Sequence, residues 1–481
     1  MQLILEIFRS ASAGDPFAFQ GGQQEYILRT ALGGAETAIL SWDEELLSDL
    51  VAVRRPGRDA AVVQRVGERL RRFLQGTSFV KREAELRAAA AHDQPVQLTL
   101  RFGAAELFAL PWELLAESGS GQFLGALPGV LLRYAWPETV TAPEAPEPRP
   151  ENGRLLFAWS AAEGAVPAAE QLAAIERACQ LGHHPFEARR DVLPNLSYAR
   201  LDEALRSARD GEPISVLHIL CHGARQDDTF GLAWNSDVDS GGTELIDALR
   251  LRQLLLPHVG QLRLVVLSAC DSANSGQLGN HLGSVAQALH RIGIAAVLAS
   301  RFPLSASGSV ILTETLYENL LYRLDSLEAA LIAARQRLLA EPSQLDWASL
   351  QLYARLEDGD DTRPFIVRPY RGLEPFFASH SRFLFGRERE RQAAREALES
   401  LRRAEKPRFL VVAGASGTGK SSVVLGGLVP DLSGAPKSAG RAAELRRVVA
   451  ELTALLEEQA HTPALREALL AITAQLEILP E

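Results

Sequence analysis

The sequence predicts an α/β fold in which helices cover both faces of a mostly parallel β-sheet. Short apolar runs alternate with segments of helical periodicity along residues 153–340. These runs are continuously apolar, which is the pattern of strands buried on both faces of a sheet. Helices between such strands are the connections that parallel pairing needs. We therefore expect an α/β/α sandwich as the main body of the protein.

Length and composition are those of a multidomain soluble protein. The 481 residues suggest about two to four domains at roughly 150 residues each. Hydrophobic residues make up 47% and charged residues 23% of the chain, close to globular averages. No apolar stretch approaches the roughly 18 residues of a membrane-spanning helix, and the opening "MQLILEIFRS" lacks the features of a secretory signal. We expect a cytoplasmic protein.

Charge and cysteine content exclude two classes of site. The formal net charge of −10 disfavours non-specific binding to nucleic acid, because the phosphate backbone is also negative. The three cysteines are too few and too scattered for a disulfide framework or a thiolate metal site, so we expect reduced thiols and no metal. Cys179 falls in an expected helix and Cys221 on an apolar strand, so both are expected to be structural.

The amino-terminal region, residues 1–136, closes with a strand, a turn and the start of a helix in "LTLRFGAAELFALPWELLAE". Pro111 suits the first turn of that helix, where a backbone N–H has no partner in any case. The linker 137–152, "PETVTAPEAPEPRPEN", follows, because its spaced prolines and acids fit neither a helix interior nor a central strand. We predict that it separates residues 1–136 from a second domain, 153–368.

The second domain carries the alternating pattern. Its expected strands are "GRLLFAWS", "ISVLHIL", "LRLVVLSA" and "IAAVLAS". Helices are expected near 168–181, 244–256 and 281–291, with two more across 305–340.

A third expected unit, residues 369–432, has a charged helix in "GRERERQAAREALESLRR" and a strand in "RFLVVA". Beyond it, leucines and valines at helical spacing predict a helical hairpin in 441–479, with helices near 441–459 and 464–478.

Two expected strands of the second domain lead into reactive side chains. "ISVLHIL" is followed by Cys221 and His222, and "LRLVVLSA" by Cys270. In an open parallel sheet, chemistry gathers beyond the carboxyl ends of the strands. A thiol is only a few per cent thiolate near neutral pH, so a nucleophilic cysteine needs a base such as histidine beside it. If the two strands are neighbours, His222 and Cys270 form a catalytic pair.

Gly223 completes the predicted catalytic site, because a residue without a side chain lets a backbone amide approach a substrate carbonyl. The amides of Gly223 and Cys270 together would hold the oxyanion of a tetrahedral intermediate. His218 shares a strand face with His222 by the period of two, so it is a candidate assisting residue. A histidine or a cysteine alone is more often structural, and only the pairing indicates peptide-bond cleavage.

Several stretches around these residues carry a family resemblance. They are "VLHILCHGA", "LVVLSACDSAN", "LGSVAQALHRIGIAAVLASRFPLS", "LEAALIAARQRLLAEPSQLDWASLQLYAR", "LPWELLAES" and "GRLLFAWSAAEG". Together they resemble the CHAT domain, a caspase-like cysteine peptidase module of bacteria that is related to caspases and separase. The resemblance covers about residues 1–368 and implies a caspase-like sandwich, with 1–136 as its pseudo-caspase-like part. His222 and Cys270 fall on the catalytic residues of that family.

Substrate preference stays open. His222 and Cys270 lie 48 positions apart, close to the roughly 50-residue spacing of caspases. The surrounding "SACDS" differs from the caspase pattern, so a strict aspartate preference is not implied. Asp227, Asp228 and Asp271 would lie near the catalytic edge and attract a basic substrate side chain, although solvated loop acids are the alternative. The resemblance implies a protein substrate, such as a pore-forming effector, and latency until a defence or programmed-death signal arrives.

The third unit contains a phosphate-binding motif. Gly414-Ala415-Ser416-Gly417-Thr418-Gly419-Lys420-Ser421 fits G-x-x-x-x-G-K-[ST] and follows the expected strand "RFLVVA". Backbone amides at Gly414 and Gly419 would surround phosphates, Lys420 would pair with the β and γ phosphates of ATP, and the Ser421 hydroxyl would hold Mg²⁺.

With "YRGLEPFFASHSRFLFGRERE" upstream, this unit resembles the start of STAND-type signalling ATPases. No apolar strand ending in paired acids follows the motif, and Asp431 comes after a proline in a loop-like run. We therefore expect a partial unit that does not hydrolyse ATP. It either binds ATP or keeps the loop only as a structural remnant, and it offers a place for a sensor or activator protein. Proteolysis itself needs no cofactor.

Three hypotheses remain open at this point. The favoured one is a CHAT-family cysteine endopeptidase that uses Cys270 as nucleophile and His222 as base. The second is a nucleotide-dependent signalling protein, which the missing acidic strand disfavours. The third is a non-catalytic caspase-like scaffold, which gives no reason to place a cysteine and a histidine at two strand ends.

Overall fold

A computed structural model of the chain contains two compact units. The first unit comprises Met1–Leu181 and Ala188–Ile366, and the second comprises Gly182–Glu187 and Val367–Glu481. The structure describes residues 2–10, 19, 21–30, 34–55, 57–91, 96–117, 121–135, 153–209, 212–226, 229–239, 241–269, 282–341, 345–354, 363–365, 370, 372, 374–404 and 409–433.

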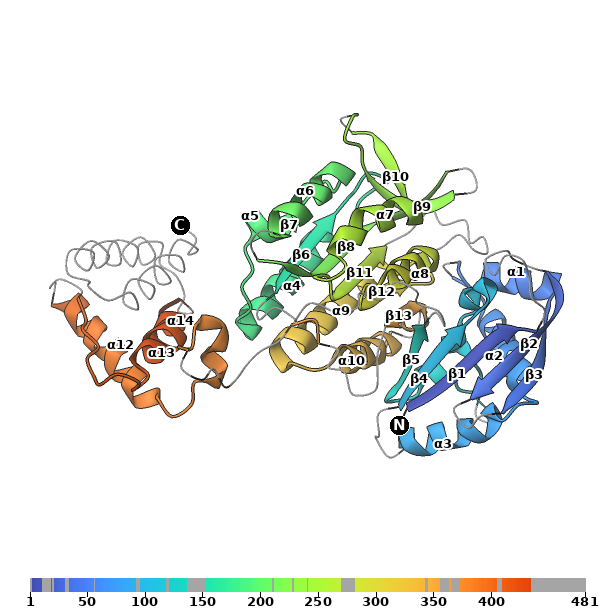
Figure 1. The fold of residues 1–481 in the computed structure, drawn as a ribbon, viewed down its shortest axis with the longest axis horizontal. Helices are drawn as coiled ribbons and strands as arrows, with labels where there is room; N and C mark the ends of the chain where they lie inside the picture. Colours follow the sequence, from blue (N-terminus) through green and yellow to red (C-terminus); the bar gives the residue numbers. More distant parts are fainter. Residues whose placement is uncertain are drawn as a thin grey trace. The chain divides into compact units, whose positions relative to one another are not determined.

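The first unit is built on one mixed, mostly parallel sheet (Figure 1). Its main path runs β10-β9-β8-β11-β12-β13-β5-β4-β1-β2-β3, and β6 pairs with β7 and with β8. The strands are β1 (Gln2–Arg9), β2 (Gly22–Thr30), β3 (Ala35–Trp42), β4 (Val96–Phe102), β5 (Val130–Ala135), β6 (Arg154–Trp159), β7 (Val192–Leu193), β8 (Ile214–Gln226), β9 (Thr229–Asn235), β10 (Thr243–Asp247), β11 (Leu264–Ala269), β12 (Ala296–Ser300) and β13 (Leu350–Ala354).

The sheet runs across both sides of the expected linker 137–152. Strand β5 lies before that segment and pairs in parallel with β13, which lies far beyond it, through Arg133 opposite Leu352 and Tyr134 opposite Tyr353. Residues 1–136 and 153–368 therefore contribute strands to a single sheet.

Helices cover both faces of this sheet, as the sequence predicts (Figure 1). They are α1 (Glu44–Ala52), α2 (Ala60–Leu74), α3 (Phe79–Ala91), α4 (Ala168–Gly182), α5 (Ala188–Asp191), α6 (Tyr198–Arg209), α7 (Ala248–Leu255), α8 (Leu282–Ile292), α9 (Ala306–Tyr317), α10 (Leu327–Leu339) and α11 (Asp346–Ser349). Shorter helical turns are η1 (Ala105–Ala109), η2 (Trp112–Leu114), η3 (Leu124–Ala126), η4 (Leu256–His258) and the π-helical η5 (Glu318–Arg323).

The two faces of β8 pack against different helices. Leu217, Ile219 and Cys221 point into the large apolar core that includes residues of α6, α7 and α8. His218 points to the opposite face, where it meets Tyr317 of α9. The alternation of side chains along the strand thus places His218 and His222 in the layer that contains α9.

Two expected helices begin or end elsewhere. The helix expected at 244–256 is only α7, because residues 243–247 pair with β9 as strand β10 and Asp247 caps the helix by accepting the Arg250 N–H at 2.8 Å. The helix expected after Pro111 is only the single turn η2. It stops there because Leu115 leaves the helical region with a ψ of 113°, and Glu113 within the turn accepts the Tyr134 hydroxyl at 2.8 Å.

The second unit contains η6 (Ala378–Phe383), α12 (Glu388–Arg403), α13 (Lys420–Ser422), the π-helical η7 (Val423–Leu428) and α14 (Val429–Ser433). The predicted charged helix is confirmed as α12. The strand predicted in "RFLVVA" is wrong: its described residues, 409–413, form no strand, and Val411 is 67% exposed. A strand needs a hydrogen-bonded neighbour, and the described part of this unit holds no other strand to pair with.

The stretch after the phosphate loop is helical from Lys420 to Ser433. Asp431 therefore lies in a helix and not in a loop, and it accepts the Arg391 side chain of α12. The helices expected near 441–459 and 464–478 lie outside the described residues. Among the residues that are described, no helix has the length and apolar character to cross a membrane.

Candidate active site

The strands that carry the predicted catalytic pair are neighbours. Strand β8 runs parallel to β11, with Leu220 opposite Ser268 and Cys221 opposite Ala269. Ala269 is the last described residue of β11, and Cys270 follows it in the sequence but lies outside the described residues. The condition that the sequence left open, adjacency of the two strands, is met.

His222 lies where β8 changes partners. The parallel pairing of β8 with β6 ends at Leu220, and its pairing with β11 ends at Cys221. From His222 onward the strand pairs with the antiparallel β9, beginning with His222 opposite Ala233. The expectation that the strand stops before His222 is therefore wrong, but His222 still lies at the carboxyl edge of the parallel sheet.

A backbone carbonyl orients the imidazole of His222. The side chain is buried, and its Nε2 lies 3.2 Å from the Ala165 carbonyl oxygen. A carbonyl can only accept a hydrogen bond, so Nε2 carries the proton in the neutral ring and Nδ1 carries the lone pair. Nδ1 is buried and has no hydrogen-bond partner within the described part of the chain. The geometry thus leaves a lone pair ready to accept a proton.

The loop Ser160–Pro167 brings that carbonyl to the histidine. It connects β6 to α4, and its turn is closed by a hydrogen bond of 3.1 Å from the Gly164 N–H to the Ala161 carbonyl. Gly164 has a φ of +131°, a value that residues with a side chain rarely adopt. Sequence reasoning missed the role of Ala165, because a backbone acceptor leaves no side-chain signature. Gly164, which the strained turn requires, was the one available signal.

The other predicted residues of this site fall into two groups. Gly223 is buried beside His222 and pairs with Leu232 of β9. Its part in holding an oxyanion stays a prediction. Three predicted acids, like Cys270, lie outside the described residues: Asp227, Asp228 and Asp271.

His218 is a core residue. Its Nδ1 lies 2.9 Å from the Tyr317 hydroxyl, and its ring meets Phe157 edge to face at 5.3 Å. Burial lowers the pKa of His218 to about 3, so the ring stays neutral at ordinary pH. Cys179 is also buried, and burial raises the pKa of its thiol well above the usual range. Neither side chain is suited to proton transfer or nucleophilic attack near neutral pH.

The phosphate-binding motif of the second unit has the backbone that its glycines predict. Gly417 and Gly419 have φ values of +80° and +79°, and Lys420 begins the helix that runs to Ser433. Lys420 Nζ donates to the Ala415 carbonyl at 2.8 Å. Left-handed glycines before a helix start direct backbone N–H groups toward a common concavity. These residues fit a phosphate group, with Ser421 exposed at the helix start.

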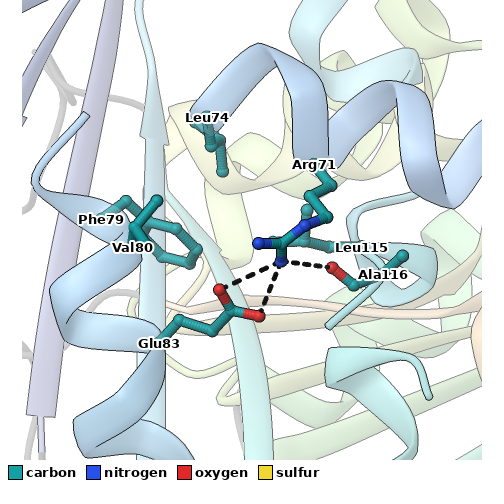
Figure 2. A pocket seen from close by; sticks show the side chains of 7 residues that line it. All are labelled: Arg71, Leu74, Phe79, Val80, Glu83, Leu115 and Ala116. Carbon is teal, nitrogen blue, oxygen red and sulfur yellow. Dashed lines mark hydrogen bonds and ion pairs between the residues drawn. The ribbon is translucent and has the colours of Figure 1, made fainter. Parts of the chain in front are cut away.

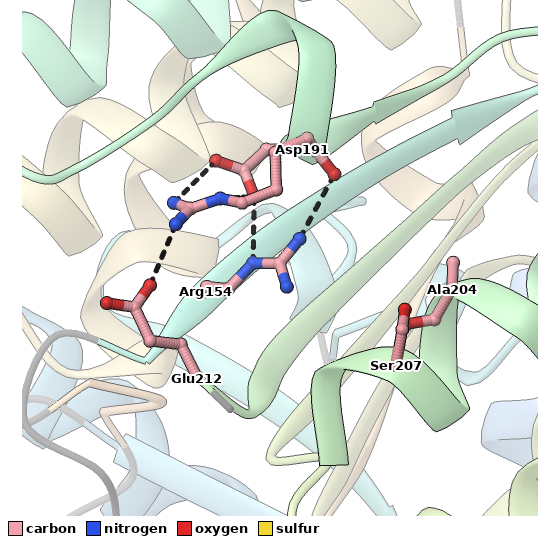
Figure 3. Close-up of polar contacts among 6 residues, drawn as sticks. Arg154, Asp191, Ala204, Ser207 and Glu212 are labelled. Atoms are coloured by element: carbon pink, nitrogen blue, oxygen red, sulfur yellow. Dashed lines mark hydrogen bonds and ion pairs between the residues drawn. The ribbon is translucent and has the colours of Figure 1, made fainter. Parts of the chain in front are cut away.

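In two other polar clusters of the first unit, arginine side chains are paired with carboxylates. Figure 2 shows a small hollow between α2 and α3, where Arg71 donates to both carboxylate oxygens of Glu83 at 3.1 and 3.2 Å. Figure 3 shows Arg154 bonded to Asp191 at 2.9 Å, at the start of β6 and so at the opposite sheet edge from His222. Among the described residues, no group of histidine, cysteine and acidic side chains could hold a metal ion.

Comparisons with known protein families agree with this architecture. The family model "CHAT domain" matches residues 64–355, which is more than half of the chain. The family model "Novel STAND NTPase 1" matches residues 369–477. No curated protein matches the chain.

Proposed function

The chain belongs to the CHAT domain family, and from this premise we propose that it is a cysteine endopeptidase with Cys270 as nucleophile and His222 as general base. One observation carries the proposal. A buried histidine, with Nε2 bound to a carbonyl and Nδ1 without a partner among the described residues, lies beside the strand that leads into Cys270. The core residue His218 also leaves one ring nitrogen without a partner among the described residues, so what marks His222 is its place at the carboxyl edge of the sheet, beside the strand that leads into Cys270.

The proposed mechanism starts with a proton transfer. His222 Nδ1 takes the proton of the Cys270 thiol, and the resulting imidazolium is stabilised because its Nε2–H bond to the Ala165 carbonyl becomes charge-assisted. The thiolate attacks the carbonyl carbon of the substrate. The backbone amides of Gly223 and Cys270 hold the oxyanion, and His222 returns the proton to the leaving amine. Water then releases the acyl group from the sulfur, with His222 again as base.

Chemical labelling tests the nucleophile. The intact protein is treated with iodoacetamide or an acyloxymethyl-ketone probe beside Cys270→Ala and His222→Ala, and labelled peptides are mapped by mass spectrometry. We expect rapid labelling at Cys270 that is lost in the first variant and reduced at least tenfold in the second. Cys179→Ala and Cys221→Ala are the matched controls, because both thiols are buried and should not react. An equal rate of Cys270 labelling in the wild type and in His222→Ala would contradict the proposal.

Peptide libraries then test the reaction itself. Cleavage within a peptide chain, absent in Cys270→Ala, would establish endopeptidase activity. Preference for a basic residue before the cleaved bond is expected if Asp227, Asp228 and Asp271 line the substrate site. Cleavage without such a preference would argue against a substrate site lined by these acids. We further propose, from the family resemblance, that the activity is latent until a defence or programmed-death signal reaches the protein.

Nucleotide binding by the second unit is a separate proposal, favoured by the left-handed Gly417 and Gly419 before the helix that starts at Lys420. In it, Lys420 would leave the Ala415 carbonyl to bind phosphate oxygens, and Ser421 would hold Mg²⁺. Titration with a fluorescent ATP analogue tests this. Lys420→Ala should weaken binding at least tenfold, whereas the exposed Lys81→Ala on α3 should not. Equal affinities would refute phosphate binding at the loop.

A further inference from the structure

One fully buried amide links three elements beneath the candidate active site. Gln171 of α4 is 0% exposed. Its Nε2 donates to Ser309 Oγ of α9 at 3.0 Å and to Ser268 Oγ of β11 at 3.4 Å. Burying an amide N–H group without a hydrogen bond costs free energy, so the two contacts of Nε2 favour one packing of the three elements.

The orientation of the amide follows from its partners. The Ser309 hydroxyl donates to the Ala306 carbonyl at 2.8 Å, so its lone pairs face Gln171 and require a donor there. The NH₂ end of Gln171 must therefore point to the serines. Its Oε1 is buried as well and has no hydrogen-bond partner in the part of the chain that the structure describes.

Ser268 connects Gln171 to β11, the strand that leads into Cys270. It lies two positions before Cys270 in the sequence, so along a strand the two positions share one face. It is also paired with Leu220 of β8, two residues before His222. The amide of Gln171 thus contacts β11 on the face of the sheet where the catalytic pair would meet.

The same helix is connected to the base. Helix α4 begins at Ala168, and the loop just before it supplies the Ala165 carbonyl that orients His222. Within seven residues of sequence, this segment contacts His222 through Ala165 and β11 through Gln171. A shift of α4 would therefore change the geometry of the base and of the nucleophile strand at once.

We propose that Gln171 is a positioning residue, which holds the end of β11 against α4 and so positions Cys270, the next residue along the chain, for its reaction with His222. The inference rests on the proposed peptidase function. A looser end of β11 would weaken the pairing of thiolate and imidazolium, so the thiol would return toward the behaviour of a free cysteine, with a pKa of about 8.5. A residue that only stabilises the core would leave that behaviour unchanged.

The test is the pH profile of Cys270 alkylation by iodoacetamide in the full chain. Gln171→Met keeps a similar length and removes both hydrogen bonds. We expect the rate at pH 7 to fall about tenfold and the inflection to move about one pH unit toward that of a free thiol. Ser268→Ala should shift the profile in the same direction. The double variant should add little to either single change, because the two residues act through one contact.

A stability control separates positioning from folding. Tyr26→Phe removes a buried hydrogen bond of 2.7 Å to Glu106, near the far end of the sheet, and should lower the melting temperature without moving the pH profile. If Gln171→Met lowers the melting temperature but keeps the wild-type inflection, Gln171 is structural and the inference is overturned. If wild-type Cys270 itself titrates as a free thiol, the proposed function fails and this inference fails with it.

Discussion

Substitution of Gly164 by alanine should break the hydrogen bond that orients His222, the base of the candidate site, while leaving the fold intact. Gly164 precedes the residue whose carbonyl accepts the His222 Nε2–H bond, and its φ of +131° lies where residues with a side chain are strained. An added Cβ would lie 3.5 Å from His222 Nε2, an ordinary contact, so the imidazole itself does not resist the change. The destabilisation therefore comes from backbone strain at position 164 and not from a side-chain clash.

The size of the effect follows from two steps. Holding alanine at this φ costs about 1–3 kcal/mol, and an exposed loop relieves that strain by rotating its peptide units, which turns the Ala165 carbonyl away from His222. A hydrogen bond to a charged group contributes about 1.5–3 kcal/mol. If that bond stabilises the imidazolium during attack, its loss lowers the rate of Cys270 labelling about 10- to 150-fold.

Gly241→Ala is the matched control. Gly241 lies in the turn between β9 and β10 with a φ of +94°, and an added Cβ there would meet nothing within 4 Å. Both variants should lose similar stability in thermal unfolding, but only Gly164→Ala should lose probe labelling. Wild-type labelling by a Gly164→Ala protein that unfolds at the same temperature as Gly241→Ala would refute the role of the carbonyl.

Three further predictions concern stability. Glu113→Gln should cost about 4 kcal/mol in urea unfolding, because Arg301 Nε lies 4.0 Å from the buried carboxylate. Tyr134→Phe removes two hydrogen bonds, one to Glu113 and one from Arg301, but keeps both charges, so it should cost less; equal losses would argue against the ion pair. Burial lowers the pKa of His218 to about 3, so the unfolded chain binds a proton that the folded one does not, and stability falls by about 1.4 kcal/mol per unit as pH drops from 6.5. His218→Gln should flatten that slope between pH 6 and 4, and an unchanged slope would contradict a neutral buried ring. Gly426→Ala places a Cβ 2.8 Å from the Phe376 Cβ, so it should destabilise the second unit by about 1–3 kcal/mol in thermal unfolding, and wild-type stability would show that the contact relaxes freely.

The adjacency of β8 and β11 was predictable because it depends on patterns that a sequence displays. Continuous apolar runs separated by helices indicate a parallel sheet, and such a sheet gathers its strand ends at one edge. The continuation of β8 past His222 was not predictable in the same way. Residues 223–226 are held as a strand by pairing with β9, and the run "HGARQ" carries no apolar pattern that indicates this pairing.

The orientation of His222 depends on a contact that no side chain encodes. The Ala165 carbonyl would be available from many residue types, so the sequence names the base without naming the group that selects its tautomer. Gln171 is a similar case: a glutamine on a helix usually faces water, and only the structure shows that this one is buried and bonded to Ser268 and Ser309.

In the phosphate loop, the sequence predicts the backbone of the loop itself but not the strand before it. Gly417 and Gly419 take left-handed conformations because their own lack of a side chain permits it, and Lys420 starts a helix directly after them. The strand expected before the loop depends instead on partner strands, and Val411 is exposed where such partners would cover it. Phosphate binding uses the loop backbone and Lys420, whereas hydrolysis also needs acids on neighbouring strands. The described residues of this unit supply the loop and the lysine that phosphate binding uses, so we expect nucleotide binding without turnover, and an ATPase rate that falls in Lys420→Ala would contradict that expectation.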